Sequence, residues 1–222
     1  QSLDGVDARH QTLAERGLAA TAKREAMRSM AAAAVATRAT EMLGTANLRA
    51  LIFKGAGLAA QTTGDWLGRG SSDVDVLVAP ADMAKVHRAL TKAGMSRRDG
   101  EAGPPSRGLK YRDCERAYAG LAITVDVHWR VDATPGYFKM QFDDLWLRRS
   151  KYQTLGVSFA TPGATDALLI TAVHGSKERY WKWRWVLDAV RQVEQIDSAG
   201  WTAALRLAAE SGSGKALAMC AA

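Results

Sequence analysis

The sequence predicts an α+β fold, in which a small mixed β-sheet lies between an N-terminal helical arm and a C-terminal helical region. Three observations predict it. Residues 6–44 contain no proline and are rich in alanine, arginine, glutamate and methionine, a composition that favours helix. Short apolar runs of strand length, separated by glycine-containing loops, occupy the centre of the chain. Helical signals return after about residue 137. We therefore divide the chain into 1–47, 48–136 and 137–222.

The composition is that of an ordinary globular protein with a basic charge balance. The 222 residues are 47% hydrophobic and 24% charged, with a formal net charge of +7, which favours polyanionic partners. No apolar run approaches the roughly 20 residues that span a bilayer, and no basic segment followed by an apolar stretch opens the chain. We therefore expect a cytoplasmic protein without a membrane partner. Cys114 and Cys220 lack metal-type spacing, so we expect incidental thiols.

The N-terminal arm is predicted to form one or two helices that end near Gly44. Its apolar positions recur at helical spacing, which predicts a stripe that covers one face of the sheet. The stripe comprises Leu13, Leu18, Ala19, Ala22, Met27, Met30 and Ala34.

The remaining elements follow from apolar periodicity and from glycine and proline boundaries. In the centre we predict a strand at 48–53, a helix at 58–66, a loop at 68–72, a strand at 73–78, a helix at 80–94, and strands at 110–117 and 121–131. In the C-terminal region we predict a short helix at 142–149, a strand at 152–159, and helices at 165–177, 181–195 and 198–210.

Two carboxylates mark the strand at 73–78. Asp73 and Asp75 are two residues apart, so both side chains project from the same face of the strand. Like charges this close repel each other unless a cation lies between them. Mg²⁺ (or Mn²⁺) suits carboxylate oxygens and retains room for substrate phosphates. The pair therefore predicts a metal site at the rim of a buried strand.

Asp126 interrupts a second apolar strand, where an unpaired carboxylate is costly. By itself it could also pair with His128 or Arg130, and His128 is more often a structural partner than a catalyst. If this strand neighbours that of Asp73 and Asp75, three carboxylates converge. That arrangement suits two-metal phosphoryl chemistry.

A glycine turn precedes these carboxylates in the sequence. Gly55 and Gly57 allow a tight passage from strand to helix, whose backbone amides and helix N-terminus suit phosphate oxygens. Lys54 and Arg69 are candidates to add positive charge there.

Three ordered motifs together resemble the DNA polymerase β-like nucleotidyltransferase superfamily, and more narrowly one bacterial branch of it. They are Phe53-Lys54-Gly55-Ala56-Gly57-Leu58, Arg69-Gly70-Ser71-Ser72-Asp73-Val74-Asp75-Val76-Leu77-Val78 and Val125-Asp126-Val127-His128-Trp129. His174-Gly175 and Arg184-Trp185-Val186-Leu187-Asp188 stand where that branch carries a later histidine and a helix with tryptophan and aspartate. The resemblance covers roughly residues 48–192.

The resemblance implies that an NMP moves from an NTP, with ATP as the favoured donor, to an acceptor hydroxyl, with release of pyrophosphate. Asp73 and Asp75 would bind both metal ions. Asp126 would bind the catalytic metal and help to deprotonate the acceptor. Lys54, Gly55 and Ala56 would hold the β- and γ-phosphates. The superfamily has serine or glycine where this chain has Ala56, so one hydroxyl contact is missing, and Ser71 or Ser72 are candidates to replace it.

A basic aromatic run, residues 177–185, has two interpretations. Cations that alternate with aromatic rings resemble a nucleic-acid stacking surface. Alternatively, the tryptophans pack in the core while the charged side chains reach outward. We favour a mixed interpretation in which Lys177 or Lys182 lines the triphosphate side of a cleft. His174 and Asp188 are either cleft residues or a buried structural pair.

Three functions are therefore carried forward. The leading one is a metal-dependent nucleotidyltransferase that acts on a hydroxyl of a small molecule, peptide or protein. The second is a catalytically inactive relative that binds a nucleotide or a partner protein, and the third is a basic nucleic-acid-binding module, which is not favoured. The acceptor, the preferred base and the oligomeric state are not encoded in these motifs.

Overall fold

The computed structural model describes residues 8–64, 69–99, 113–133, 138–154 and 156–221. It contains a five-stranded mixed sheet, a two-stranded sheet and helices at both ends of the chain, so the predicted α+β class is confirmed. Among these described residues, no helix combines the length and the apolar character that a bilayer crossing requires.

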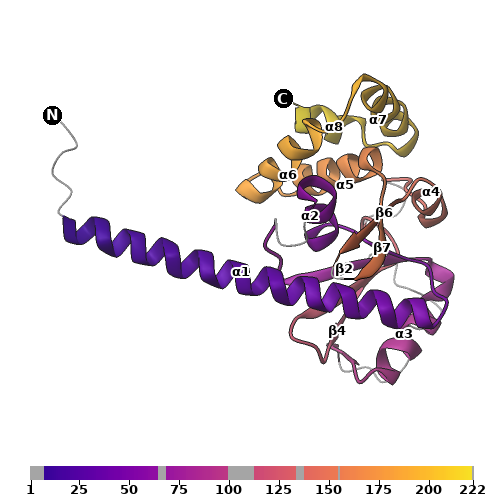
Figure 1. The fold of residues 1–222 in the computed structure, drawn as a ribbon. Helices are drawn as coiled ribbons and strands as arrows, with labels where there is room; N and C mark the ends of the chain where they lie inside the picture. The colour runs from indigo at the N-terminus through magenta and orange to yellow at the C-terminus, as the bar shows by residue number, and fades with distance from the viewer. Residues whose placement is uncertain (1–7, 65–68, 100–112, 134–137, 155, 222) are drawn as a thin grey trace.

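The N-terminal arm is one continuous helix, α1 (Ala8–Thr45). Its first half extends away from the rest of the molecule, and its second half lies along the sheet (Figure 1). The buried apolar side chains of this second half belong to one core with strand residues from the sheet, such as Val76 and Val127: Ala33, Val35, Ala36, Ala39 and Leu43. The C-terminal part of the arm therefore covers the sheet, as predicted for the arm. Leu18, Met27 and Met30 of the predicted stripe are instead exposed.

The five-stranded sheet has the order β1-β2-β5-β4-β3. Only the central pair, β2 and β5, is parallel, and the other neighbours are antiparallel. The strands are β1 (Ala50–Ile52), β2 (Asp73–Val78), β3 (Ser96–Arg97), β4 (Glu115–Ala119) and β5 (Thr124–His128). Sequence periodicity did not predict β3, because two residues are too few to show an alternation. Residues 110–112 of a predicted strand lie outside the described part.

The alternation of side chains on β2 separates a core from a site. Val74, Val76 and Val78 face the core that α1 covers. Asp73 and Asp75 lie on the other face, where the next residue of that series, Leu77, packs into a second core. This second core includes Phe142 and Ile170 from the C-terminal region. The acidic face of β2 therefore looks toward the C-terminal helices.

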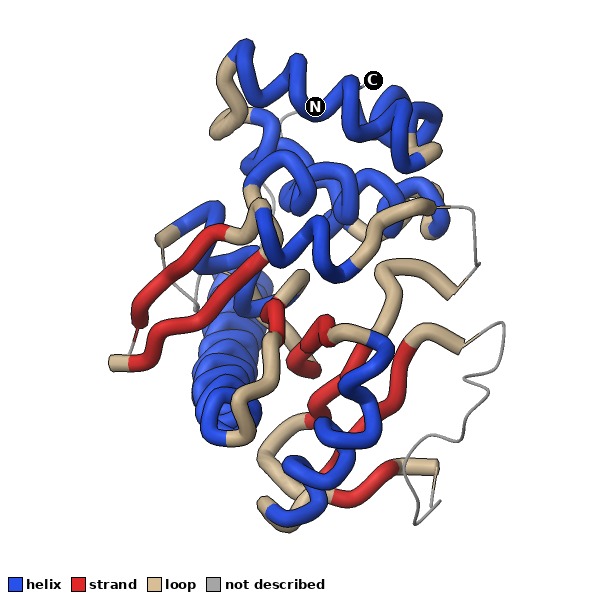
Figure 2. The backbone as a smooth tube through the Cα atoms, turned by 90° about the vertical axis from the view of Figure 1, so that its right-hand side faces the viewer, coloured by secondary structure: helices blue, strands red, loops and turns tan. Residues whose placement is uncertain are grey.

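Helices cover the remaining surfaces. In the centre are α2 (Gly55–Thr63), the short 3₁₀ helix η2 (Pro80–Asp82) and α3 (Met83–Lys92). In the C-terminal region are α4 (Phe142–Leu147), α5 (Ala164–Lys177), α6 (Trp183–Val193), α7 (Ser198–Ser211) and α8 (Gly214–Ala221). Figure 2, in which α1 is seen end-on, shows the C-terminal helices gathered on one side of the strands. Helix α8 was not predicted.

The strand predicted at 152–159 is instead a hairpin. Its strands are β6 (Ser150–Thr154) and β7 (Val157–Thr161), which pair antiparallel. Gly156 adopts φ 75° between them, a conformation that glycine allows without strain, and this turn divides the predicted strand into two. Strand β7 contacts both β1 and α1.

Candidate active site

A polar cleft of about 260 Å³ lies where the acidic face of β2 and β5 meets α5 and α6. Its lining includes six residues that the sequence predicted for the site: Lys54, Arg69, Asp73, Asp75, Asp126 and Lys182. The others are Ser71, Glu115, His174, Glu178, Arg184 and Trp185. Cations and carboxylates are therefore interspersed around one cavity.

The three predicted carboxylates share one face of the central parallel pair. Asp75 is the direct register partner of Asp126, and Asp73 is the partner of Thr124. Because directly opposed residues point to the same face, Asp73, Asp75 and Asp126 all line the cleft. The two strands are therefore neighbours, which is the condition under which the three carboxylates were expected to converge.

Asp75 is held as a carboxylate by two nitrogen atoms. Lys54 Nζ lies 3.2 Å and His128 Nε2 lies 2.8 Å from the same atom, Asp75 Oδ1. Burial opposes ionisation of Asp75, but the Lys54 charge and the His128 hydrogen bond outweigh it and hold the pKa well below its ordinary range. Asp75 is therefore a permanent anion at neutral pH.

Asp126 has the opposite environment. Its Oδ1 atom is buried and has no hydrogen-bond partner among the described residues. Burial, together with the charges of Asp75 and Asp73, raises the pKa of Asp126 to about 7. A buried carboxylate oxygen without a donor, beside two other carboxylates, is a position where a cation would be strongly stabilised.

The glycine turn places α2 directly beside the carboxylates. Lys54 precedes α2 with φ 56° and ψ −161°, an uncommon conformation for a residue with a side chain. A Cβ atom on Gly57 would lie 2.2 Å from the carbonyl oxygen of Ile52, so only glycine fits the passage from β1 to α2. The N-terminus of α2 is therefore held close to the strand that precedes it, next to the cleft.

Ser71 brings a hydroxyl group to the glycine turn, where Ala56 lacks one. A Cβ atom on Gly55 would lie 2.8 Å from Ser71 Oγ, so this hydroxyl reaches the glycine turn. Ser71 Oγ also donates to the carbonyl oxygen of Asp73 at 2.8 Å. Ser72 Oγ lies 3.4 Å from Asp73 Oδ2. Of the two candidate replacements for the hydroxyl missing at Ala56, Ser71 is the one in the cleft lining.

Arg69 joins the cleft to the C-terminal region through an ion pair with Asp188. The Arg69 Nε atom lies 2.9 Å from both carboxylate oxygens of Asp188, and both side chains are buried. Of the two alternatives for Asp188, the structure has a buried structural pair, but its partner is Arg69 and not His174. The predicted phosphate contact from Arg69 would have to use the rest of its guanidinium group.

The two lysines predicted for the triphosphate side lie in different places. Lys182 lines the cleft and pairs with Glu178 at 2.7 Å. Lys177 pairs with Asp132 at 2.6 Å, and the described residues that line the cleft do not include it. The structure therefore brings Lys182 to the carboxylates and leaves Lys177 in another contact.

His174 is a cleft residue that stacks on Trp185. The centroids of the two rings are 5.7 Å apart, and the rings are nearly parallel, with an interplanar angle of 10°. Burial, together with the nearby charges of Lys54 and Lys177, holds the pKa of His174 well below its ordinary value, so the imidazole is neutral at pH 7. Its Nε2 atom is buried without a hydrogen-bond partner in the described part of the chain.

Glu115 and Arg184 are cleft residues to which no site role was assigned from the sequence. Glu115 begins β4, an antiparallel neighbour of β5, and so reaches the site from a strand without a motif. The sequence signals for Arg184 were the basic aromatic run, in which the mixed interpretation assigned only Lys177 or Lys182 to the cleft, and residues 184–188 of the family resemblance.

Comparisons with known proteins identify the family of the chain. The model of a family described as uncharacterised nucleotidyltransferase matches residues 5–222, nearly the whole chain. The chain belongs to this family. Nucleotidyltransferases are transferases, so the protein is an enzyme by family, and the predicted superfamily is confirmed.

A solved structure shares the fold at low sequence identity. It is the solution structure of the antibiotic-resistance factor ANT(2'')-Ia, with a TM-score of 0.50 and 9% identity, covering 78% of this chain and 86% of that chain. At this identity the likeness concerns the fold alone. A search of curated proteins found no match.

Proposed function

We propose that this nucleotidyltransferase moves an NMP from a nucleoside triphosphate to a hydroxyl group of a small molecule, peptide or protein, in a reaction that depends on Mg²⁺ or Mn²⁺. ATP is the favoured donor. The observation that carries the proposal is the convergence of Asp73, Asp75 and Asp126 on one face of β2 and β5, within a cleft that also contains lysine and arginine side chains.

The donor set fits a hard divalent cation. All three side chains offer carboxylate oxygens, the ligands that Mg²⁺ prefers. The buried Asp126 oxygen without a partner among the described residues supplies the unsatisfied ligand position. When bound, such ions neutralise phosphate charge and polarise the phosphoryl group. Asp73, Asp75 and Asp126 would hold them.

The chain's own residues supply proton transfer and orientation. Asp126 would accept the proton of an acceptor hydroxyl; before any metal ion binds, burial and the neighbouring carboxylates raise its pKa to about 7. Asp75 keeps its charge because Lys54 and His128 fix it in position. The two carboxylates thus have different protonation behaviour, although they lie opposite each other in one strand pair.

The turn before α2 and the cationic side chains of the cleft would bind the triphosphate. The N-terminus of α2, at Gly55 and Ala56, presents a positive dipole end and backbone amides to the phosphates. Lys54, Arg69, Lys182 and Arg184 add positive charge to the same cavity. Ser71, whose Oγ atom lies beside Gly55, would supply the hydroxyl that Ala56 lacks by turning from the carbonyl oxygen of Asp73.

The acceptor class stays open within this proposal. A cleft lined by both carboxylates and cations accommodates a polar hydroxyl compound as well as a serine, threonine or tyrosine side chain. The fold likeness to an antibiotic-resistance factor makes antibiotics one set of small-molecule acceptors to include in a screen.

The first experiment is a thermal unfolding titration with each of the four NTPs, with and without Mg²⁺. The test variant is Asp73→Asn with Asp75→Asn, and the control is Asp143→Asn, an exposed carboxylate that pairs with Arg49 on the surface. We expect one NTP, favoured to be ATP, to raise the melting temperature of the wild type and the control only when Mg²⁺ is present. The double variant should fold and show no such rise.

Turnover is measured next as pyrophosphate release with candidate acceptors. Stabilisation that needs both Mg²⁺ and the aspartates, followed by release of pyrophosphate with one acceptor, supports the enzyme. Binding without turnover on any acceptor would favour the catalytically inactive relative. Stabilisation by polyanions with no dependence on Mg²⁺ would favour the nucleic-acid-binding module and would overturn the proposal.

A further inference from the structure

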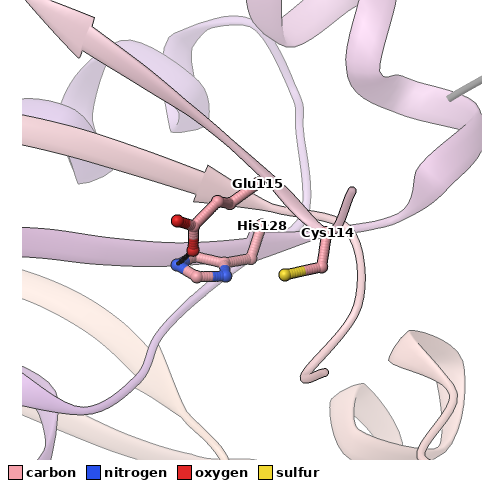
Figure 3. Close-up of side chains that lie close together, drawn as sticks. All are labelled: Cys114, Glu115 and His128. Carbon is pink, nitrogen blue, oxygen red and sulfur yellow. Dashed lines mark ion pairs between the residues drawn. The ribbon is translucent and has the colours of Figure 1, made fainter. Parts of the chain in front are cut away.

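Beside the carboxylates, three side chains of another chemical type gather at the end of the β4–β5 pair. Cys114 directly precedes β4, Glu115 is the first residue of β4, and His128 is the last residue of β5 and the register partner of Glu115. One sulfur, oxygen or nitrogen atom from each lies within 4.8 Å of the others. Figure 3 shows the three side chains turned toward one another.

The hydrogen bonds of His128 determine which ring nitrogen carries a proton. Its Nε2 atom lies 2.8 Å from an oxygen of Asp75 and 3.2 Å from an oxygen of Glu115. Because both neighbours are carboxylates, which accept hydrogen bonds, Nε2 carries the proton and donates. In the neutral imidazole, Nδ1 is then left with a bare lone pair.

That lone pair is buried and unsatisfied. His128 is 1% exposed, and its Nδ1 atom has no hydrogen-bond partner anywhere in the described residues. In Figure 3, the ring nitrogen without a dashed line lies on the side of the ring that the Cys114 sulfur occupies. A buried acceptor without a donor is costly, and a metal ion is a partner that would remove this cost.

We infer that Cys114, Glu115 and His128 form a second metal site, which takes a zinc-class ion through the sulfur, Nδ1 and a carboxylate oxygen of Glu115, whose half-exposed side chain would turn from Nε2 to the ion. Thiolate and imidazole ligands select zinc over magnesium, whereas the all-carboxylate set of Asp73, Asp75 and Asp126 suits magnesium. Three protein ligands leave one of four zinc positions open for water or substrate.

The arrangement of His128 matches how proteins orient a zinc-binding histidine. Such a histidine donates its other ring N–H to a carboxylate, which fixes the tautomer and the ring orientation. Here that carboxylate is Asp75, at 2.8 Å from Nε2. A zinc-class ion on Nδ1 would therefore also hold His128 in the orientation in which it positions Asp75, so the second site is connected to the first through one side chain.

The test uses Co²⁺ as a spectroscopic substitute for zinc, on the full chain treated with chelator and without any nucleotide. Cobalt bound by a thiolate gives a sulfur-to-metal charge-transfer band in the near ultraviolet. The test variant is Cys114→Ala, and the matched control is Cys220→Ala, which removes the chain's other free thiol from α8. Asp73→Asn serves as a second control, because it alters only the carboxylate site.

We expect one thiolate-bound Co²⁺ per chain, counted from its charge-transfer band, in the wild type, in Cys220→Ala and in Asp73→Asn, and displacement of that ion by equimolar Zn²⁺. Cys114→Ala should lose the band and bind Co²⁺ at least roughly tenfold more weakly. Circular dichroism checks that this variant is folded.

Absence of a thiolate band in the wild type, or a band that Cys114→Ala leaves unchanged, would overturn the inference. A band that disappears in Asp73→Asn would do the same, because binding of the ion would then depend on the carboxylate site. The outcome is independent of nucleotide transfer, since no NTP is present. Failure of the metal site therefore leaves the proposed function untouched, and failure of NTP binding leaves the metal site untouched.

Discussion

Asp75 and Asp126 lie directly opposite each other across β2 and β5, yet their environments move their pKa values in opposite directions. Lys54 and His128 contact Asp75 and keep it ionised. Asp126 lacks such donors among the described residues, so burial and the charge of Asp75 favour its protonated form. This difference within one strand pair leads to a pH-dependent stability.

We expect wild type to lose stability relative to Asp126→Asn as pH rises from about 4 to about 7. The folded pKa of about 7 lies above the ordinary aspartate pKa of 3.8, so the folded state retains a proton in this window that the unfolded state has released. The stabilising effect of protonated Asp126 is complete below the unfolded pKa and is lost as pH passes through the folded pKa. Chemical denaturation without divalent metal, at several pH values, measures it.

The comparison with Asp126→Asn is needed because His174 changes the stability with pH in the opposite direction. Its lowered pKa makes the protein less stable as pH falls below the unfolded value of 6.5. Both proteins contain His174, so this effect cancels in their difference. A difference in unfolding free energy that is constant from pH 4 to 8 would contradict the assigned environment of Asp126.

Lys54 contacts Asp75 and lines the cleft that we propose binds the triphosphate, so its substitution should weaken nucleotide binding more than it lowers stability. For Lys54→Gln we expect the dissociation constant of the preferred MgNTP to rise roughly 10- to 100-fold, the effect of losing one charged hydrogen bond. Lys85→Gln, which removes an exposed lysine paired with Asp82, is the control and should bind as wild type does. Equal affinities for the two variants would remove Lys54 from the nucleotide site.

The ion pair of Arg69 with Asp188 should be a stability element. Asp188→Asn leaves a buried guanidinium without its anion, and we expect the free energy of unfolding to fall by about 3–5 kcal/mol. Urea denaturation measures the change. Replacing both partners by apolar residues, as in Arg69→Met with Asp188→Leu, should recover part of the loss, because no unpaired charge remains. The exposed pair of Arg206 with Glu210 is the control. If Asp188→Asn lowers the free energy of unfolding by less than Glu210→Gln does, burial is not the cause of the effect.

The passage from β1 to α2 should tolerate no side chain at Gly57. A Cβ atom there would lie 2.2 Å from the carbonyl oxygen of Ile52, so Gly57→Ala should destabilise the protein by about 1–3 kcal/mol through displacement of the backbone. The matched control is Gly44→Ala in α1, where a Cβ atom would meet nothing within 4 Å. Thermal unfolding of the pair should show a loss only for Gly57→Ala.

Local sequence patterns predicted most of the helices and strands, because their apolar periodicity depends only on residues close together in the sequence. The strand at 73–78 was predicted with its observed ends, since alternation, a preceding loop and a following proline all agree there. The hairpin β6–β7 and the final helix α8 were not predicted. In the hairpin, a single glycine turn lay inside what looked like one strand.

The sequence by itself determined the fold class, the family and the set of acidic residues that face one side of β2, because a two-residue spacing fixes the face of a strand whatever surrounds it. Only the tertiary structure decided which groups meet across strands and helices. It paired Asp75 with Asp126, Arg69 with Asp188 and Lys177 with Asp132, and it brought Cys114 and Glu115 to His128. These contacts join residues from different elements, so they depend on strand order and register, which no local spacing encodes.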